Sequence, residues 1–170
     1  MKRKKQILVI GYGKDYCTDV AYKIAYEVGH EIAKCGMILI TGGLGGVMEA
    51  ASRGARDGGG LVIGILPQDD MRMSNIYCDA VIATGIGLAR DFVTAYSADA
   101  VIVVGGGAGT LIELCAAYQR KTPIISVRGT GGVADRFAGG YIDDREVERI
   151  LQEDSAEAAV RHAISLITVE

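Results

Sequence analysis

Proline is nearly absent from this chain of 170 residues, which has only Pro67 and Pro123. Collagen and flexible linkers need proline-rich or strongly polar sequence, and the 49% hydrophobic content here excludes both. No apolar run reaches the ~18 residues of a membrane-spanning helix. The basic stretch Lys2–Lys5 is followed by too few apolar residues for a secretory signal. We therefore expect a cytoplasmic protein without a membrane partner.

Paired cysteines and excess positive charge are also missing. The four cysteines lie at positions 17, 35, 78 and 115, a spacing that offers neither paired zinc ligands nor a dense disulfide framework. We expect reduced thiols and no metal site. The formal net charge is −3, whereas non-specific nucleic-acid binding needs a basic face that neutralises phosphates. We therefore expect no nucleic-acid partner.

The chain does contain a regular alternation of short apolar segments and helical patterns. Buried parallel strands are almost continuously apolar, and this pattern predicts strands at Gln6–Ile10, Met37–Thr41, Leu61–Leu66, Ala80–Ala83, Ala100–Val104 and Pro123–Val127. Helices are expected at Thr18–Lys34, Gly46–Asp57, Leu88–Ala98, Thr110–Arg120 and about Ser155–Leu166. Residues 129–146 form a glycine-containing, charge-rich connection that is long enough for a lid or an interface segment.

This alternation predicts the α/β class. Strands that alternate with helices form βαβ units, which pair as a parallel sheet covered on both sides. We expect one three-layer Rossmann-like domain over residues 1–170, with a mostly parallel sheet of about six or seven strands and helices on both faces.

Glycine is abundant, with 24 residues in 170, against a usual share of ~7%. Most glycines follow predicted strands: Gly11 and Gly13; Gly42, Gly43, Gly45 and Gly46; Gly105, Gly106, Gly107 and Gly109; and Gly129, Gly131 and Gly132. The carboxyl ends of parallel strands form the ligand crevice of such folds, and helix N-termini there attract anions. The first three groups predict a site for a phosphate-bearing ligand, with tight turns as the alternative. The hydroxyls of Thr41 and Thr110 either contact the phosphate or bond to strand ends.

The first glycine loop matches neither common phosphate motif. Tyr16 stands where the third glycine of the dinucleotide fingerprint would be, and Asp15 follows Gly13-Lys14 where a P-loop would have serine or threonine. Tyr12 and Tyr16 beside this loop either stack on a ligand ring or pack in the fold.

Three segments, TGGLGGVMEAA from Thr41, GGLVIGILP from Gly59 and GGGAGTLIE from Gly105, resemble the lonely-guy-type Rossmann superfamily over roughly residues 6–128. The resemblance is strongest to its molybdenum-cofactor-carrier-like branch. The family signature is P-G-G-x-G-T-x-x-E, with Gly105 in place of the proline and Glu113 as the glutamate. The family arginine stands 23 residues before that glutamate, at Arg90. The resemblance implies a Rossmann-like fold, a phosphorylated small-molecule ligand and a homo-oligomer, either a dimer or a tetramer.

The resemblance leaves three functions open. In phosphoribohydrolases of the superfamily, the arginine and glutamate assist cleavage of an N-glycosidic bond, so Arg90 and Glu113 would be catalytic in a nucleoside 5′-monophosphate phosphoribohydrolase. Asp91 stands where those enzymes carry lysine, which favours a carrier or sensor of a nucleotide or molybdopterin-like cofactor. An interaction module with a vestigial site is the third reading.

Arg90 and Glu113 also have structural alternatives. Thr110-x-x-Glu113 fits a helix capping box. Arg90 and Asp91 could form a salt bridge at a solvated helix start.

Overall fold

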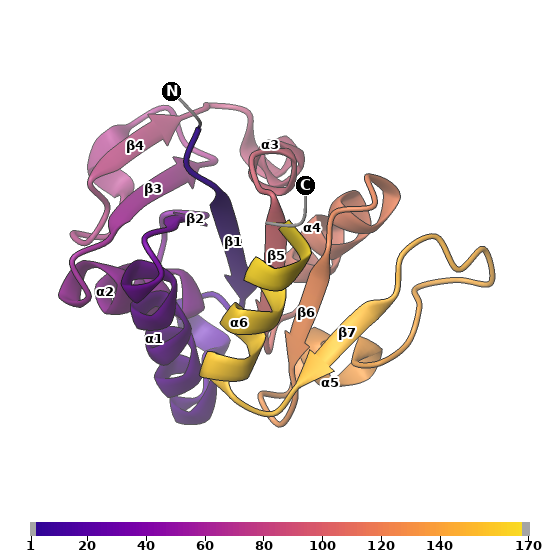
Figure 1. Ribbon diagram of the computed structural model, residues 1–170. Coiled ribbons are helices and arrows are strands. Elements are labelled where there is room, and N and C mark those ends of the chain that lie inside the picture. The colour runs from indigo at the N-terminus through magenta and orange to yellow at the C-terminus, as the bar shows by residue number, and fades with distance from the viewer. Residues whose placement is uncertain (1–2, 168–170) are drawn as a thin grey trace.

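The computed structural model describes residues 3–167, which contain a seven-stranded sheet in the order β4-β3-β2-β1-β5-β6-β7 (Figure 1). All neighbouring strands are parallel. The strands are β1 (Gln6–Gly11), β2 (Ile38–Thr41), β3 (Leu61–Leu66), β4 (Ala80–Ala83), β5 (Ala100–Val104), β6 (Ile124–Val127) and β7 (Ile150–Glu153). The predicted α/β class and parallel sheet are confirmed.

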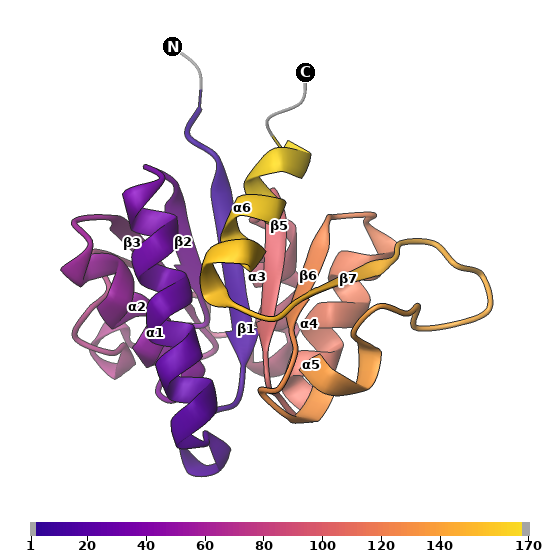
Figure 2. The same cartoon turned by 60° about the horizontal axis from the view of Figure 1, so that its bottom comes forward.

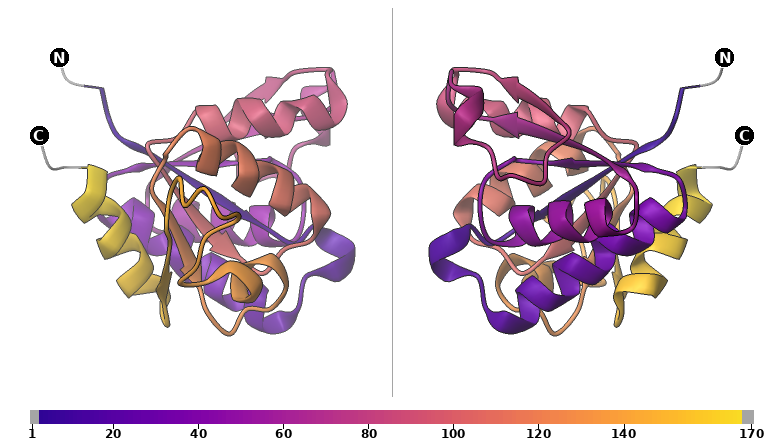
Figure 3. Two further views of the ribbon diagram at one scale, coloured as in Figure 1. Left: turned by 90° about the vertical axis from the view of Figure 1, so that its right-hand side faces the viewer. Right: turned by 90° about the vertical axis from the view of Figure 1, so that its left-hand side faces the viewer.

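Helices cover both faces of the sheet (Figures 2 and 3). One face is covered by α1 (Asp19–Lys34), α2 (Val47–Asp57) and α6 (Ala156–Ile167), and the opposite face by α3 (Arg90–Tyr96), α4 (Ala108–Gln119) and α5 (Gly132–Phe137). Within residues 3–167, none of these helices combines the length and apolar composition that a membrane crossing requires.

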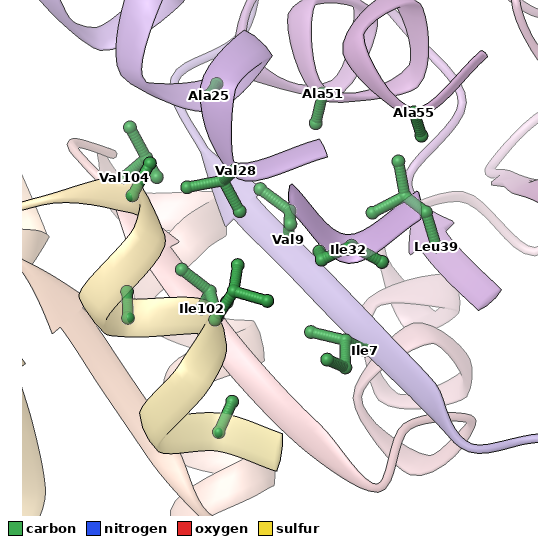
Figure 4. Close-up of a cluster of buried hydrophobic side chains, with 14 of the residues drawn as sticks. Ile7, Val9, Ala25, Val28, Ile32, Leu39, Ala51, Ala55, Ile102 and Val104 are labelled. Carbon is green, nitrogen blue, oxygen red and sulfur yellow. The ribbon is translucent and has the colours of Figure 1, made fainter. Parts of the chain in front are cut away.

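Two apolar cores lie on either side of the central strands. Ile7 and Val9 of β1 point into the core beneath α1, α2 and α6 (Figure 4). Leu8 and Ile10 point to the opposite face, where α4 and α5 cover them. Because successive side chains of a strand face opposite sides, a strand buried on both faces has no polar positions. This explains the continuous apolar run in the sequence.

The structure differs from the sequence prediction between residues 129 and 153. The segment that we expected to be an irregular connection contains the short helix α5, and a strand that we did not predict, β7, follows it. Both elements have weak local signals, because α5 spans six residues and begins at a glycine, whereas β7 spans four residues and ends in Gln152-Glu153. β7 forms because it pairs with β6 at the sheet edge, which is a long-range interaction.

The sheet order positions the site. From β1, the chain extends the sheet in one direction through β2, β3 and β4, and in the other through β5, β6 and β7. The strand order therefore reverses between β1 and β5. In open α/β sheets, such a reversal separates the loops at the carboxyl ends of the two strands and leaves a crevice for a ligand.

Candidate functional site

A cavity of about 500 Å³ lies at the carboxyl ends of the central strands. It collects residues from four places: the ends of β1 and β2, the turn before α3, and the start of α4. The predicted site residues that line it are Gly11, Gly13, Gly42, Arg90, Gly107, Gly109, Thr110 and Glu113. Their role in ligand binding remains a prediction, but the fold does bring them together around one cavity.

The N-terminus of α4 is open to this cavity. Gly107 is the N-cap residue, and no side chain caps the helix. The first amides of an α-helix have no acceptor within the helix and carry a partial positive charge. Gly107, Ala108 and Gly109 are exposed, and a Cβ atom at either glycine would meet no atom within 4 Å. Backbone N–H groups at this point are therefore free to donate to an anion.

Thr110 is in the first turn of α4, and its hydroxyl donates to the carbonyl of Gly11 at 2.9 Å. The capping-box alternative for Thr110 and Glu113 is wrong. The helix begins at Ala108, two residues earlier than we expected, so Thr110 is inside it and cannot serve as its N-cap. Glu113 instead accepts a hydrogen bond from the hydroxyl of Thr94 at 2.9 Å.

Arg90, Asp91 and Glu113 form a buried charged cluster at the cavity wall. One guanidinium nitrogen of Arg90, Nη1, lies 3.5 Å from Oδ1 of Asp91 and 3.8 Å from Oε1 of Glu113. The three residues are 7%, 4% and 8% exposed, respectively. The salt bridge that we considered as the alternative for Arg90 is therefore present, but it is buried and not solvated. Nε of Arg90 is also buried without a hydrogen-bond partner in residues 3–167.

Gly42 sets the position of the guanidinium. A Cβ atom at Gly42 would lie 2.4 Å from Nη1 of Arg90 and 2.6 Å from the sulfur of Met48. The absence of a side chain therefore lets Arg90 lie directly against the end of β2. Sequence reasoning predicted Gly42 as a ligand-binding residue; in the structure it lines the cavity and also packs against Arg90.

Burial changes the protonation of the cluster. Desolvation, reinforced by the negative charge of Asp91, raises the pKa of Glu113 to about 8, although Arg90 and the Thr94 hydroxyl act in the opposite direction. Desolvation also raises the pKa of Asp91, against the effect of Arg90. Two neighbouring carboxylates that share one guanidinium repel each other when both are ionised, so ionising the second one costs free energy. At neutral pH the cluster therefore keeps a proton on Glu113.

The loop between β2 and α2 is closed by contacts within the chain. Thr41 is fully buried, and its hydroxyl oxygen accepts a hydrogen bond from the amide of Gly43 at 3.1 Å. This geometry favours the strand-end alternative for Thr41 over contact with a phosphate. The predicted site residues that do not line the cavity are Thr41, Gly43, Gly45, Gly46, Gly105 and Gly106.

The glycine loop after β6 is closed as well. The carboxylate of Asp135 accepts hydrogen bonds from the amides of Gly129 at 2.7 Å and Gly131 at 3.0 Å. The hydroxyl of Thr130 accepts from the amide of Gly105 at 2.9 Å. The amides of Gly129 and Gly131 therefore already donate to an acceptor within the chain and are not available to an anion.

The two tyrosines of the first loop differ in environment. Cβ atoms at Gly105 and Gly132 would lie 2.3 Å and 2.4 Å from the side chain of Tyr12, which therefore packs against these glycines. Tyr16 is 80% exposed and lines the cavity. Tyr12 lines the cavity too, but it is partly buried, so Tyr16 is the more accessible of the two rings.

Sequence reasoning missed several residues of the wall. Asp91 was considered as a departure from a family pattern and as a charge at the helix start, but not as a site residue, and Met48 and Leu88 were not singled out. All three line the cavity. Thr94 was missed too, although its hydroxyl bonds to Glu113. The spacing of Asp91 and Thr94 along α3, three residues apart, was a usable signal, because residues at this spacing share a helix face.

Comparisons with known proteins agree with this architecture. The chain is 31% identical over 156 residues to a cytokinin riboside 5′-monophosphate phosphoribohydrolase of Mycobacterium tuberculosis, covering 82% of this chain and 83% of that protein. The structure of a molybdenum cofactor binding protein from Rippkaea orientalis is similar with a TM-score of 0.88 and 34% identity, covering 99% of this chain and 100% of that one.

The molybdenum cofactor carrier protein of Chlamydomonas reinhardtii is similar with a TM-score of 0.86 and 33% identity, covering 98% of this chain and 100% of that one. These similarities confirm the resemblance to the lonely-guy-type superfamily that the glycine motifs predicted. The profile of the SLOG cluster4 family matches residues 4–160, and the chain belongs to that family.

Proposed function

We propose that this protein binds a phosphorylated small molecule, a nucleotide or a molybdopterin-like cofactor, and acts as its carrier or sensor. The observation that carries this proposal is the uncapped N-terminus of α4, which opens into a cavity of about 500 Å³. The amides of Gly107–Thr110 would hold the phosphate, because a helix N-terminus supplies both free donors and positive potential. Arg90, whose Nε lacks a partner in residues 3–167, adds a positive charge to the same wall.

The remainder of the cavity suits a planar, partly apolar group. Met48 and Leu88 contribute apolar surface, and Tyr16 contributes an exposed aromatic ring. Small-molecule sites combine such apolar walls with a few polar groups that fix orientation. Supporting evidence comes from the similar carrier protein of Chlamydomonas reinhardtii and the cofactor binding protein of Rippkaea orientalis.

A second candidate is a nucleoside 5′-monophosphate phosphoribohydrolase, which the similarity to the Mycobacterium tuberculosis enzyme favours. In such a reaction the C–N bond between ribose and base breaks, water adds to the ribose carbon, and the base takes a proton. Glu113 holds a proton at neutral pH in the free protein and could donate it to the leaving base. Its ionised form could then accept the proton from the attacking water.

One experiment separates carrier from hydrolase. Purified protein is incubated with AMP and with cytokinin-type riboside 5′-monophosphates, and free base is measured by chromatography. The carrier proposal expects binding, seen as a raised melting temperature, without release of base. Release that is lost in Glu113→Gln but kept in Glu49→Gln would establish the hydrolase. Glu49 is a suitable control because it is on α2 and does not line the cavity.

Mass spectrometry of ligand that co-purifies with the protein gives an independent answer. A phosphorylated pterin or a nucleotide in stoichiometric amount would support the carrier proposal. If no phosphorylated compound co-purifies and none raises the melting temperature, the vestigial-site alternative gains support.

We further propose that the chain forms a homo-oligomer through α3 and α4. Phe92 and Tyr96 of α3 are 49% and 54% exposed, and they border a groove of about 440 Å³ together with Ile112 and Cys115 of α4. A two-fold interface needs a patch that complements itself, and aromatic side chains beside an apolar groove meet that need. Tyr96→Glu should then lower the mass measured by light scattering to that of a monomer. Leu61→Glu is the control, because Leu61 is at the start of β3 and does not border this groove, and it should leave the mass unchanged.

A further inference from the structure

Thr94 has more hydrogen-bond acceptors around it than its single hydroxyl proton can serve. Its Oγ lies 2.8 Å from the backbone carbonyl of Asp91 and 2.9 Å from Oε1 of Glu113, and the carbonyl of Arg90 is farther away at 3.5 Å. Ser97, at the end of α3, bonds only to a backbone carbonyl of its own helix. Such a bond one turn back is ordinary for a helical threonine or serine. The contact with Glu113, on another helix, therefore needs a separate explanation.

Both groups of this contact are removed from water. Thr94 is fully buried, and Glu113 is 8% exposed. Nη1 of Arg90 lies 3.8 Å from Oε1 of Glu113, which is an ion-pair contact and too long for a hydrogen bond. Within residues 3–167, the hydrogen bond of the Glu113 carboxyl is the one with Thr94. A buried carboxyl needs a partner whether it is protonated or ionised, and Thr94 is placed to serve it in both states.

A hydroxyl group can serve both states because it donates and accepts, and its proton turns about the C–O bond. When Glu113 is ionised, its carboxylate is a stronger acceptor than a neutral carbonyl, so Thr94 donates to it. When Glu113 is protonated, Thr94 can donate to the Asp91 carbonyl and accept the carboxyl proton. On ionisation the proton of Glu113 leaves for solvent or ligand, and the proton of Thr94 turns toward Glu113.

We propose that Thr94 is a positioning residue, whose hydroxyl proton turns from the Asp91 carbonyl to the Glu113 carboxylate when Glu113 ionises and so keeps this carboxyl at the cavity wall in both states. Because a hydrogen bond to a charged group is the stronger one, Thr94 favours the ionised form and lowers the pKa of Glu113, against the larger effect of desolvation. The charged and titratable groups that line the cavity together with Glu113 are Tyr12, Tyr16, Arg90 and Asp91.

Carboxyl-carbon NMR on protein labelled with carbon-13 glutamate tests this proposal. The signal of Glu113, assigned by its loss in Glu113→Gln, gives the pH at which the group ionises. Thr94→Val keeps the shape of the side chain and removes the hydroxyl. It should raise this midpoint by about half a pH unit to one pH unit, which is the difference between a hydrogen bond to a charged group and one to a neutral group. Thr94→Ser keeps the hydroxyl and should restore the original midpoint.

Thr84→Val is the matched control. The hydroxyl of Thr84 donates to the carbonyl of Leu66 at 2.6 Å, so its loss should lower stability without moving the midpoint of Glu113. A merely structural role for Thr94 would give this same result in Thr94→Val. An unchanged or lowered midpoint in Thr94→Val would therefore overturn the inference.

The unaltered protein decides if Thr94→Val does not fold. The hydroxyl proton of Thr94 should move downfield in the proton spectrum at the same pH at which Glu113 ionises, because it then donates to a charged acceptor. A hydroxyl signal that stays in place across this pH range would overturn the inference.

A binding measurement connects Thr94 to the ligand, and this step rests on the proposed function. Glu113 lies about 7.5 Å along α4 from Ala108, at 1.5 Å per residue, so its ionisation should weaken binding of ribose 5-phosphate at least about threefold. In Thr94→Val this loss should occur at a higher pH. If the NMR midpoint shifts but ribose 5-phosphate binds at no pH, the proposed phosphate site fails and the role of Thr94 stands. If ribose 5-phosphate binds and the midpoint does not shift, the role of Thr94 fails and the phosphate site stands.

Discussion

Of the glycine-containing loops that follow parallel strands in this protein, those after β2 and β6 differ from the one after β5. In the loops after β2 and β6, side chains adjoining the loop accept hydrogen bonds from the backbone amides, and we call these loops closed. Thr41 accepts from the amide of Gly43, and Asp135 accepts from the amides of Gly129 and Gly131. The loop after β5 is open at Gly107–Gly109, with exposed backbone and no cap on α4.

Glycine therefore has two different structural roles in these loops. In the closed loops, glycine permits backbone to approach backbone, and the amides already have acceptors. In the open loop, glycine leaves amides accessible, which is the property that an anion site needs. Glycine density alone therefore does not identify a candidate anion site; the absence of an internal acceptor for the loop amides is the more specific criterion.

The largest expected effect is on a closed loop. Gly46 has φ of +73°, and a Cβ atom there would lie 2.5 Å from the carbonyl oxygen of Tyr12. Gly46→Ala should lower the free energy of unfolding by about 3 kcal/mol or more, because it combines backbone strain with a steric clash. Chemical denaturation measures this change. A loss below about 1 kcal/mol would show that the loop adjusts and is not tightly closed.

The second-largest effect is expected at Glu113, which lines the cavity. Because the pKa of Glu113 is raised from 4.5 to about 8, the folded state binds this proton more tightly than the unfolded chain does. The free energy of unfolding should therefore fall as pH rises through this range. Glu113→Gln cannot titrate and should flatten the fall by on the order of 2 kcal/mol, less than the full shift because Asp91 and Arg90 face the same group.

Denaturation curves across the same pH range check this expectation. Glu49→Gln, with its carboxylate away from the cavity, should keep the slope of the unaltered protein. A slope that is unchanged in Glu113→Gln would mean that Glu113 is ionised in the folded protein at neutral pH.

Asp135 tests the closed loop after β6. Asp135→Ala leaves the amides of Gly129 and Gly131 without their acceptor and should cost about 1–2 kcal/mol of unfolding free energy. Ligand affinity should not change, since Asp135 does not line the cavity. Asp144→Ala, at an exposed position, is the control and should leave the free energy of unfolding unchanged. A change in ligand affinity in Asp135→Ala would extend the ligand site to this loop.

The smallest effect on stability is expected in the open loop. Gly107 has φ of −118°, and a Cβ atom there meets no atom within 4 Å. Gly107→Ala should change the free energy of unfolding by less than about 0.5 kcal/mol, yet it places a methyl group where a phosphate would approach. Affinity for ribose 5-phosphate should fall. Unchanged affinity together with unchanged stability would remove Gly107 from the site.

Much of the fold could be predicted because its signals are local. α1 was placed within one residue, since Thr18 caps it through the amide of Ala21 and Gly36 ends it with φ of +70°. The six predicted strands are all present. Burial on both faces makes the central strands continuously apolar, whereas the edge strand β4 is apolar although none of its residues is buried. β7 was missed because its four residues gain their strand conformation from pairing with β6.

The sequence predicted which residues could meet at the site, whereas their contacts needed the structure. The spacing of Arg90 and Glu113 pointed to a common site, and the spacing of Asp91 and Thr94 puts those two on one face of α3. No local signal showed that this face would meet Glu113 or line the cavity. These contacts depend on the packing of α3 against α4, which lie side by side on one face of the sheet (Figure 3).

By itself, the sequence determined the class of fold, the positions of six apolar strands along the chain and the positions of the glycine turns. These properties follow from hydrophobic periodicity and from the backbone freedom of glycine, which act over a few residues. Only the tertiary structure decided which loop is open and what protonation the cluster has. Both depend on groups far apart in the chain, because burial and charge proximity arise when distant segments pack together.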